Sequence, residues 1–520
     1  MSESRPNFLL VMADQLTVRA LPAYGNETVQ APRLESLAEA GVVFDSAYCN
    51  SPLCTPSRAA MLTGQLPTRT GVYDNAAELP ASIPTIAHYL RSSGYRTCLA
   101  GKMHFVGPDQ LHGFEERITT DVYPASFDWT PDWERPLDDR LPWYHDMSSV
   151  LEAGRSEATL QLDFDEEVAH RAVRKIFDLA RDDRDRPFFL VASFTHPHDP
   201  YEVPAEYLDR YRGVAIDRPV LGAIPDGQLD PHSQRLKAMC GANGLAISDE
   251  MVIEARRAYY AAVTYFDDQV GRLLDALDRS GLAGNTIVIV TTDHGDMLGE
   301  RGLWYKMSFF EPSARVPLIV YGADRFAPHR VPENVSHVDL LPTLLELAGA
   351  GESIQPVDPI DGTSLVPLLQ GEDRDWPDTV IGEYLAEGLY APLVMIRRGA
   401  WKYLHCPGDP DQLYDIESDP DECRNLALDP ARADLLEAFR AEAASRWDLD
   451  QLRERVIASQ RRRRLVVGAL SRGRYSSWDY RPPDDESTRY VRGNDFWDPF
   501  ASKRLRPTGP QPASAGESGS

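Results

Sequence analysis

The sequence has few cysteines, no long apolar run and too few basic residues to balance its acidic ones. Its 520 residues include only 6 cysteines, and no two of them form a C-x-x-C pair. So sparse a set excludes a disulfide framework and indicates free thiols in a reducing compartment. The first six residues are polar and the apolar run after them stops at Asp14, so neither a signal peptide nor a membrane span is expected. We predict a cytoplasmic protein without a membrane partner.

Basic charge is scarce as well. The 54 Lys and Arg residues stand against 80 Asp and Glu residues, which gives a formal net charge of -26. Such a chain repels a phosphate backbone unless a local basic face overrides the repulsion, so no nucleic-acid partner is expected. Four consecutive arginines, Arg461 to Arg464, are a candidate for such a face. Given the net charge, we interpret this run as a solvated or subunit-contacting segment.

The sequence does contain several short apolar runs that lack the alternation of a half-exposed sheet. Helical patterns lie between them, and this alternation predicts an α/β fold with a large, mostly parallel sheet flanked by helices on both faces. The apolar runs are Asn7 to Met12, Thr97 to Ala100, Phe188 to Phe194, Thr286 to Thr292 and Val316 to Tyr321. The helical patterns are Ala31 to Ala40, Ile83 to Ser93, Glu166 to Arg181 and Met251 to Arg279.

The composition divides the chain into three parts. Residues 1–387 form the large α/β domain, and residues 388–471 form a smaller subdomain in which short strand-like runs predict an antiparallel sheet and 431–447 a helix. Residues 472–520 are rich in Arg, Asp, Pro and aromatic residues and end in a Pro/Ser/Gly tail, as expected of an arm with a disordered end. We expect this arm to dock on a neighbouring subunit, in a homo-oligomer (a dimer or tetramer).

Polar residues follow four of the predicted strands. In open α/β sheets, ligands bind outside the carboxyl ends of the strands, so these residues are expected to converge on one site. Asp14 or Asp293 alone would be interpreted as a strand-end cap to the next helix, but the pair weakens that interpretation. In chain order the strands run into Asp14 and Gln15, Lys102 and His104, His196 and His198, and Asp293 and His294.

A further candidate is the segment Cys54 to Arg58, which reads Cys-Thr-Pro-Ser-Arg and precedes an apolar helical pattern. Pro56 fits the first turn of a helix, so Cys54 lies at or just before the helix N-terminus, where backbone N–H groups favour an anion. An isolated cysteine is more often a buried structural thiol. The five-residue motif is more specific than an isolated cysteine.

With this segment the sequence resembles the sulfatase family of the alkaline phosphatase superfamily. The C-x-P-S-R signature of that family marks a cysteine that a formylglycine-generating enzyme oxidises to formylglycine. The resemblance covers most of the chain and implies that 1–387 is a catalytic sulfatase domain. It implies that the hydrated formylglycine from Cys54 attacks the sulfur of a sulfate ester, and that its second hydroxyl then expels sulfate. Further matches are Gly64, Arg69 to Gly71, Pro197, Gly295, Lys306 and Arg315 to Pro317.

The resemblance also implies a role for each polar residue. Asp14, Gln15, Asp293, His294 and an oxygen of the modified Cys54 would bind one divalent metal ion. The other implied roles are transition-state stabilisation by Arg58, Lys102 and Lys306, proton transfer by His104 and His198, and donation to a sulfate oxygen by Asn75. A turn-forming Asn75 is the alternative. We interpret His112, His145 and His170 as surface or core residues.

Two of these ligand positions depart from the common family pattern. Gln15 stands where an acid is usual, and His294 stands where an asparagine is usual. The site therefore loses one formal negative charge and gains an imidazole, which makes Mn²⁺ or Mg²⁺ as credible as Ca²⁺.

Within the family the sequence is most similar to the choline sulfatases, in the segments Tyr48 to Cys54, Gly101 to Gly107, Phe127 to Trp133 and Gly382 to Tyr384. This implies hydrolysis of choline O-sulfate to choline and sulfate. A quaternary ammonium has no N–H donor, so aromatic faces and negative charge must recognise it. The resemblance implies Trp129 and Glu383 for this task; core packing and a solvated strand end are the respective alternatives.

Other functions fit the same motifs. Phosphonate monoester and phosphodiester hydrolases and arylsulfatases share the fold and the modified cysteine, and a single sequence does not separate transfer at sulfur from transfer at phosphorus. A noncatalytic relative that binds sulfate or ammonium is a third possibility, if Cys54 stays a thiol.

Overall fold

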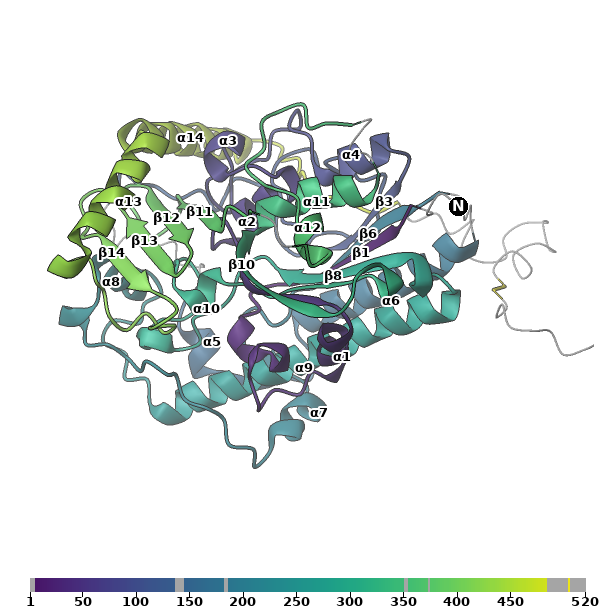
Figure 1. The fold of residues 1–520 in the computed structure, drawn as a ribbon, viewed down its shortest axis with the longest axis horizontal. Helices are drawn as coiled ribbons and strands as arrows, with labels where there is room; N and C mark the ends of the chain where they lie inside the picture. The colour runs from purple at the N-terminus through teal and green to yellow at the C-terminus, as the bar shows by residue number, and fades with distance from the viewer. Residues whose placement is uncertain are drawn as a thin grey trace, which may run out of the picture.

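The predicted apolar runs form the middle of an eight-stranded sheet (Figure 1), which confirms the α/β class. The computed structural model describes residues 5–135, 145–181, 186–349, 354–372, 375–483 and 504–505. The strand order is β10-β2-β9-β8-β1-β6-β3-β4. The predicted strands are β1 (Asn7–Ala13), β3 (Arg96–Gly101), β6 (Phe188–Ser193), β8 (Thr286–Thr292) and β9 (Leu318–Tyr321).

Three strands of this sheet lack a continuous apolar run and were therefore not predicted from the sequence. They are β2 (Val42–Tyr48), β4 (Glu116–Arg117) and β10 (His329–Ser336). β9 pairs antiparallel with both β8 and β2, and the remaining pairs are parallel. Because β1, β3, β6 and β8 are parallel neighbours, their carboxyl ends meet at one edge of the sheet.

Helices cover both faces of the sheet, as predicted (Figure 1). On one face lie α1 (Pro32–Ala40), α6 (Leu160–Arg181) and α9 (Asp249–Ser280). On the other lie α2 (Cys54–Thr63), α4 (Ile86–Ser92) and α11 (Leu340–Leu347). The shorter helices are α3 (Pro67–Thr70), α5 (Ser148–Leu151), α7 (Ala205–Leu208), α8 (Pro231–Met239), α10 (Glu311–Ala314) and α12 (Val366–Leu369).

The smaller subdomain contains the predicted antiparallel sheet, but the predicted boundary at 387 and 388 comes one strand too late. Its strands are β11 (Thr379–Tyr384), β12 (Leu393–Arg398), β13 (Trp401–His405) and β14 (Gln412–Asp415). β11 precedes the change in composition but pairs with β12 over its whole length. Of the two helices that follow, α13 (Ala433–Arg446) was predicted, whereas α14 (Leu449–Leu470), which carries the four arginines, was not.

Most of the C-terminal arm, 484–503 and 506–520, lies outside the described residues. Its described part packs on the large domain of the same chain, where the Tyr480 carbonyl accepts a hydrogen bond from Thr120 and the Trp478 ring contacts Phe127. None of the helices in the described part is long and apolar enough to cross a bilayer. The cytoplasmic location and the homo-oligomer stay predictions.

A buried cluster of charges joins the two parts of the fold. Lys402 of β13 has no exposed surface, and its Nζ lies 2.6 Å from a carboxylate oxygen of Glu311 in α10 and 2.8 Å from one of Glu422. It also donates to the Phe309 carbonyl at 2.8 Å. Burial alone would lower the pKa of Lys402, but the two carboxylates raise it, so the ammonium stays charged. This ammonium compensates two buried negative charges at once.

We expect Lys402→Met to lower the free energy of unfolding by about 3 to 5 kcal/mol, because Glu311 and Glu422 would remain buried without a counter-charge. Urea unfolding followed by circular dichroism measures the loss. Arg398→Met is the control, since the Arg398 side chain is 45% exposed in its pair with Glu442 and is expected to cost less than about 1 kcal/mol. Equal losses for the two variants would contradict the assigned role of Lys402.

Candidate active site

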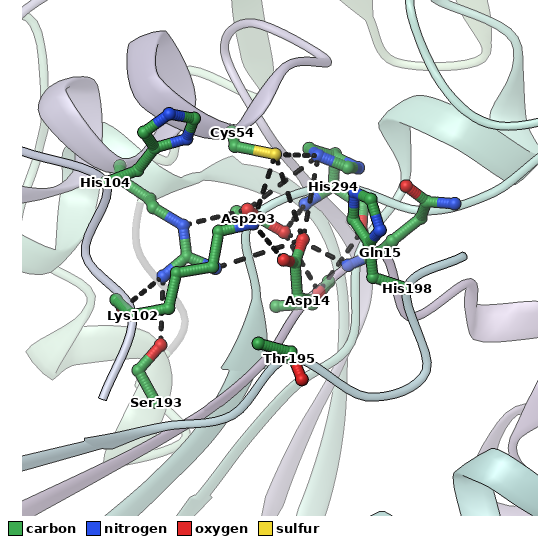
Figure 2. Close-up of polar contacts among 12 residues, drawn as sticks. Asp14, Gln15, Cys54, Lys102, His104, Ser193, Thr195, His198, Asp293 and His294 are labelled. Carbon is green, nitrogen blue, oxygen red and sulfur yellow. Dashed lines mark hydrogen bonds and ion pairs between the residues drawn. The ribbon is translucent and has the colours of Figure 1, made fainter. Parts of the chain in front are cut away.

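The polar residues that follow the parallel strands converge on the N-terminus of α2 (Figure 2). Asp14 follows β1, Lys102 follows β3 and Asp293 follows β8, and all three side chains are buried. The Sγ of Cys54, the first residue of α2, lies 3.9 Å from Asp14 Oδ1, 3.5 Å from Lys102 Nζ and 3.2 Å from His294 Nε2. The structure therefore brings these predicted site residues together.

A glycine allows the loop after β8 to pack closely behind the site. A Cβ on Gly295 would lie 2.0 Å from the Pro312 carbonyl oxygen, a distance that no side chain tolerates. The Gly295 carbonyl in turn lies 3.0 Å from His294 Nδ1. Because a carbonyl oxygen only accepts, Nδ1 carries the proton and Nε2 keeps its lone pair. Burial lowers the pKa of His294 to about 3, so the ring is neutral and Nε2 is a possible metal ligand.

Four of the predicted ligands form a donor set that suits a divalent cation. One atom each of Asp14, Cys54, Asp293 and His294 lies within 4.8 Å of the others, and all four residues are buried. Burial, together with the nearby Asp293, raises the pKa of Asp14 to about 7. A cation between two such carboxylates would relieve their repulsion, so these residues fit the predicted metal.

Gln15, the fifth predicted ligand, lies next to these residues and has several polar partners. Its backbone N–H donates to Asp293 at 3.1 Å, but its side chain is directed away from the Cys54 thiol (Figure 2). The amide accepts from Lys306 Nζ at 2.6 Å and donates to Asp296 at 2.6 Å and to Asp199 at 3.1 Å. Gln15 stays a predicted ligand, and its side-chain oxygen is shared with Lys306.

Arg58 and Lys102 supply positive charge to the same cluster. Arg58 Nε donates to Asp293 at 2.8 Å and Nη1 donates to Ser193 at 2.9 Å, while Nη2 has no hydrogen-bond partner in the described part of the chain. The Lys102 ammonium is hydrogen-bonded to Asp14 and lies 4.4 Å from the centre of the Tyr123 ring. Both cations stand where negative charge on a reacting group would be stabilised.

His198 and Lys306 form a second polar group beside the thiol. The Asp199 carbonyl lies 2.6 Å from His198 Nδ1, so this nitrogen carries the proton and Nε2 accepts from Lys306 Nζ at 2.7 Å. Burial and Lys306 hold the pKa of His198 well below its usual value. A neutral ring between an ammonium and the pocket can take up or pass on a proton at Nε2.

His104 is the second predicted proton-transfer residue. Its backbone is left-handed, with φ 57°, which is uncommon for a residue with a side chain. Both ring nitrogens are buried and neither has a hydrogen-bond partner among the described residues. Such unmet polar atoms are costly in a folded protein and are typical of a binding or catalytic site.

Above the thiol lies a pocket of about 190 Å³. It contains the predicted Asn75, whose Oδ1 accepts from the Thr55 N–H at 3.0 Å, and the predicted Trp129, whose ring lies 5.1 Å from that of Tyr123. The pocket lining therefore combines a cationic side chain, Lys306, with aromatic rings. Its lining consists of Cys54, Asn75, Tyr123, Trp129, His145, His198, Asp199 and Lys306.

Sequence reasoning missed three of the lining residues, Tyr123, His145 and Asp199. We interpreted His145 as a surface or core residue, but its Nδ1 lies 3.2 Å from Asp199 in the pocket wall. Burial would raise the pKa of Asp199, but His198 and His145 hold it well below the usual value, so the carboxylate is ionised. Asp199 could have been predicted as a site residue, because it directly follows His198 in the sequence. Tyr123 and His145 lie in irregular segments, where no sequence pattern indicated a site residue.

Glu383 does not reach this pocket, which corrects its predicted role. Its carboxylate accepts from the N–H and the hydroxyl of Thr68 at 2.8 and 2.9 Å and from Trp447 Nε1 at 2.7 Å, and it lines a separate cleft. Four residues later, both carboxylate oxygens of Glu387 are buried without a hydrogen-bond partner in the described chain. Burial and Asp74 raise the pKa of Glu387 to about 8, and Lys306 is close enough to oppose that rise.

The chain is similar to known proteins over most of its length. A family model described as Sulfatase matches residues 6–350, and one described as Choline sulfatase enzyme C terminal matches residues 454–504. The Choline-sulfatase of Rhizobium meliloti (strain 1021) is 47% identical over 98% of this chain and 100% of its own length. The Arylsulfatase of Clostridium perfringens is 30% identical over 81% of this chain and 90% of its own.

A solved structure shares the fold. The Phosphonate Monoester Hydrolase of Agrobacterium radiobacter superposes with a TM-score of 0.67 at 25% identity, covering 86% of this chain and 96% of that one.

We expect Asp293→Asn to lower the affinity for Mn²⁺ by more than about a hundredfold, because even residues that only orient metal ligands cost 10- to 100-fold when removed. Metal content after equilibration with Mn²⁺ and gel filtration, measured by mass spectrometry, gives the result. The control is Asp267→Asn, since the Asp267 carboxylate is also buried but accepts from the N–H groups of Arg33 and Leu34. Full metal content in Asp293→Asn would remove the donor set from consideration.

Proposed function

The chain belongs to the sulfatase family, and on that premise we propose that it hydrolyses choline O-sulfate to choline and inorganic sulfate. The observation that carries the proposal is the pocket beside Cys54, whose lining contains both the cation Lys306 and the aromatic rings of Tyr123 and Trp129. A sulfate ester of a quaternary ammonium alcohol has the matching charge distribution. The 47% identity to a protein named Choline-sulfatase supports the same substrate.

The proposal includes maturation of Cys54 to formylglycine by a formylglycine-generating enzyme and one bound divalent ion, Ca²⁺, Mn²⁺ or Mg²⁺. When present, the aldehyde hydrate and the ion supply an activated hydroxyl nucleophile. Asp14, Asp293 and His294 would hold the ion, and Gln15 stays a predicted ligand. The distances from the Cys54 thiol to Asp14 (3.9 Å), His294 (3.2 Å) and Lys102 (3.5 Å) support a shared site.

The remaining polar residues act on the sulfuryl group. Lys102, Lys306 and Arg58 stabilise the negative charge that spreads over its oxygens during transfer, and Arg58 Nη2 has a donor to spare. Asn75 orients an oxygen from the pocket wall. His198 Nε2 takes up a proton from Lys306 Nζ, to which it is hydrogen-bonded, and passes it to the leaving alkoxide, while His104 holds or removes a proton at the nucleophile.

In the same pocket, Trp129 and its neighbours Tyr123 and His145 supply the aromatic rings proposed to recognise the trimethylammonium group. A cation over an aromatic face is attracted by the ring quadrupole, and a quaternary ammonium needs no hydrogen-bond acceptor. Glu387 replaces Glu383 as the proposed source of nearby negative charge, because its oxygens are buried and unpartnered. Binding of a cation would favour its ionised form.

Phosphonate monoester hydrolysis is the second candidate, supported by the superposition on such an enzyme. Parallel turnover of choline sulfate, p-nitrophenyl sulfate and a phenyl phosphonate ester decides between them. Choline sulfate is expected to give the highest kcat/KM. Brisk phosphonate cleavage with negligible choline sulfate turnover would overturn the proposal, and fast aryl sulfate turnover alone would favour an arylsulfatase.

Cys54→Ser is expected to lower kcat at least about a thousandfold while the fold is kept, since serine is not converted to the aldehyde by cysteine oxidation. Intact mass of the wild-type peptide that contains Cys54 reports the conversion, and thermal unfolding reports the fold. Cys98→Ser, another buried thiol, is the control. Substantial turnover by Cys54→Ser would exclude the formylglycine mechanism, and an unmodified, inactive wild type would favour a noncatalytic relative.

Trp129→Ala is expected to lower kcat/KM for choline sulfate about tenfold, which corresponds to a cation–π loss of about 1 to 2 kcal/mol. Ethyl sulfate, which has no ammonium group, should lose much less. Trp401→Ala is the matched control, because Trp401 also lies under a cation, Arg432, at 4.9 Å, but in the small sheet. Equal losses for both esters would argue against a role of Trp129 in ammonium recognition.

A further inference from the structure

Arg463 is buried, unlike the other arginines of the run Arg461 to Arg464. Arg461 is 63% exposed and pairs with Glu134 at the surface. The Arg463 side chain, two residues further along α14, is only 7% exposed and reaches into the large domain. A buried guanidinium is retained in a fold only where specific partners compensate it.

Those partners lie next to the pocket. Arg463 donates from Nη1 and Nη2 to both oxygens of Asp74, at 2.6 and 2.7 Å, and Asp74 has no exposed surface. Nη1 also donates to the Thr130 hydroxyl at 3.2 Å. The next residue after Asp74 is Asn75, and the residue before Thr130 is Trp129, and both line the pocket. One planar guanidinium thus connects the two loops that carry them.

The neighbouring turn of α14 reinforces this connection. Gln460, also fully buried, accepts from the Trp133 N–H at 3.0 Å, and Trp133 Nε1 donates to the Ala386 carbonyl at 2.9 Å, next to Glu387. Arg463 itself opposes the rise that burial and Asp74 cause in the pKa of Glu387. α14 therefore contacts the segment that carries Trp129 at two points, Thr130 and Trp133.

We infer that Arg463 is a positioning residue for substrate selectivity: through Asp74 and Thr130 it fixes Asn75 and Trp129 relative to each other. The inference deepens the proposed function and rests on it for the choice of ester. Residues 6–350, which the Sulfatase family model matches, hold the sulfuryl end of the site, whereas Arg463 lies in the separately matched segment 454–504. A contact from that segment is suited to tuning which ester binds.

The test compares Arg463→Lys with wild type on choline sulfate and on methyl sulfate, whose alkyl group is too short to reach Trp129. Lysine keeps a charge for Asp74 but lacks the planar fork that also reaches Thr130. We expect the ratio of kcat/KM for choline sulfate to that for methyl sulfate to fall about tenfold, mainly through KM. Arg462→Lys, at an exposed position in the same run, should leave the ratio unchanged.

Two further variants separate positioning from a general structural role. Arg463→Gln and Asp74→Asn should each lower the ratio of the two kcat/KM values by a similar factor. The double variant should lower it no further than the more affected single variant, because both substitutions break the same ion pair. A purely structural role would lower the melting temperature and reduce turnover of both esters equally, leaving the ratio unchanged; that result would overturn the inference.

Failure of the proposed function gives a different result. If the wild type does not turn over choline sulfate, the proposed substrate is wrong, and the ratio is then measured between the best ester found and its methyl counterpart. An unchanged ratio in Arg463→Lys with that ester would reject the positioning role, and a reduced ratio would support it.

Discussion

The parallel pairing of β1 and β8 places two carboxylates side by side where no water reaches. Ala13 pairs with Thr292 in this register, so the next residues, Asp14 and Asp293, leave adjacent strand ends together. Each buried carboxylate costs several kcal/mol unless it is compensated. The sheet register therefore creates a demand for positive charge at one point, and the surrounding residues are organised around that demand.

The compensation comes from the elements that also carry the reacting group. Arg58 lies four residues after Cys54, on the same side of α2, so the helix that presents the thiol also brings a guanidinium to Asp293. Lys102 contacts both Asp14 and the thiol. A divalent ion would complete the neutralisation. Nucleophile, cations and carboxylates are thus held by one set of contacts, and moving any of them leaves another charge buried alone.

Local sequence patterns predicted this part of the site because strand ends and a helix start are local features. Asp14, Cys54, Lys102 and Asp293 each directly follow or begin an element whose apolar pattern is visible. Tertiary contacts decided the rest. Glu383 and Glu387 are four residues apart and chemically identical. Only the folded structure shows that the Glu383 carboxylate already accepts hydrogen bonds from Thr68 and Trp447. The edge strand β10 was missed because Val331 and Val335 are its only valine, leucine or isoleucine residues and Pro332 interrupts it, so that its pairing with β2 identifies it as a strand.

The same distinction applies to substrate choice. The sulfuryl end uses strand-end residues of the sheet, a fold shared with a phosphonate hydrolase structure. The aromatic rings of the pocket come from irregular segments around Tyr123, Trp129 and His145, which lie outside the helices and strands. Charge on the reacting group alone separates sulfate from phosphonate esters poorly. Under the proposed function, discrimination between choline sulfate and other esters would depend on how firmly α14 and its neighbours fix these segments, a property that lies outside the catalytic residues themselves.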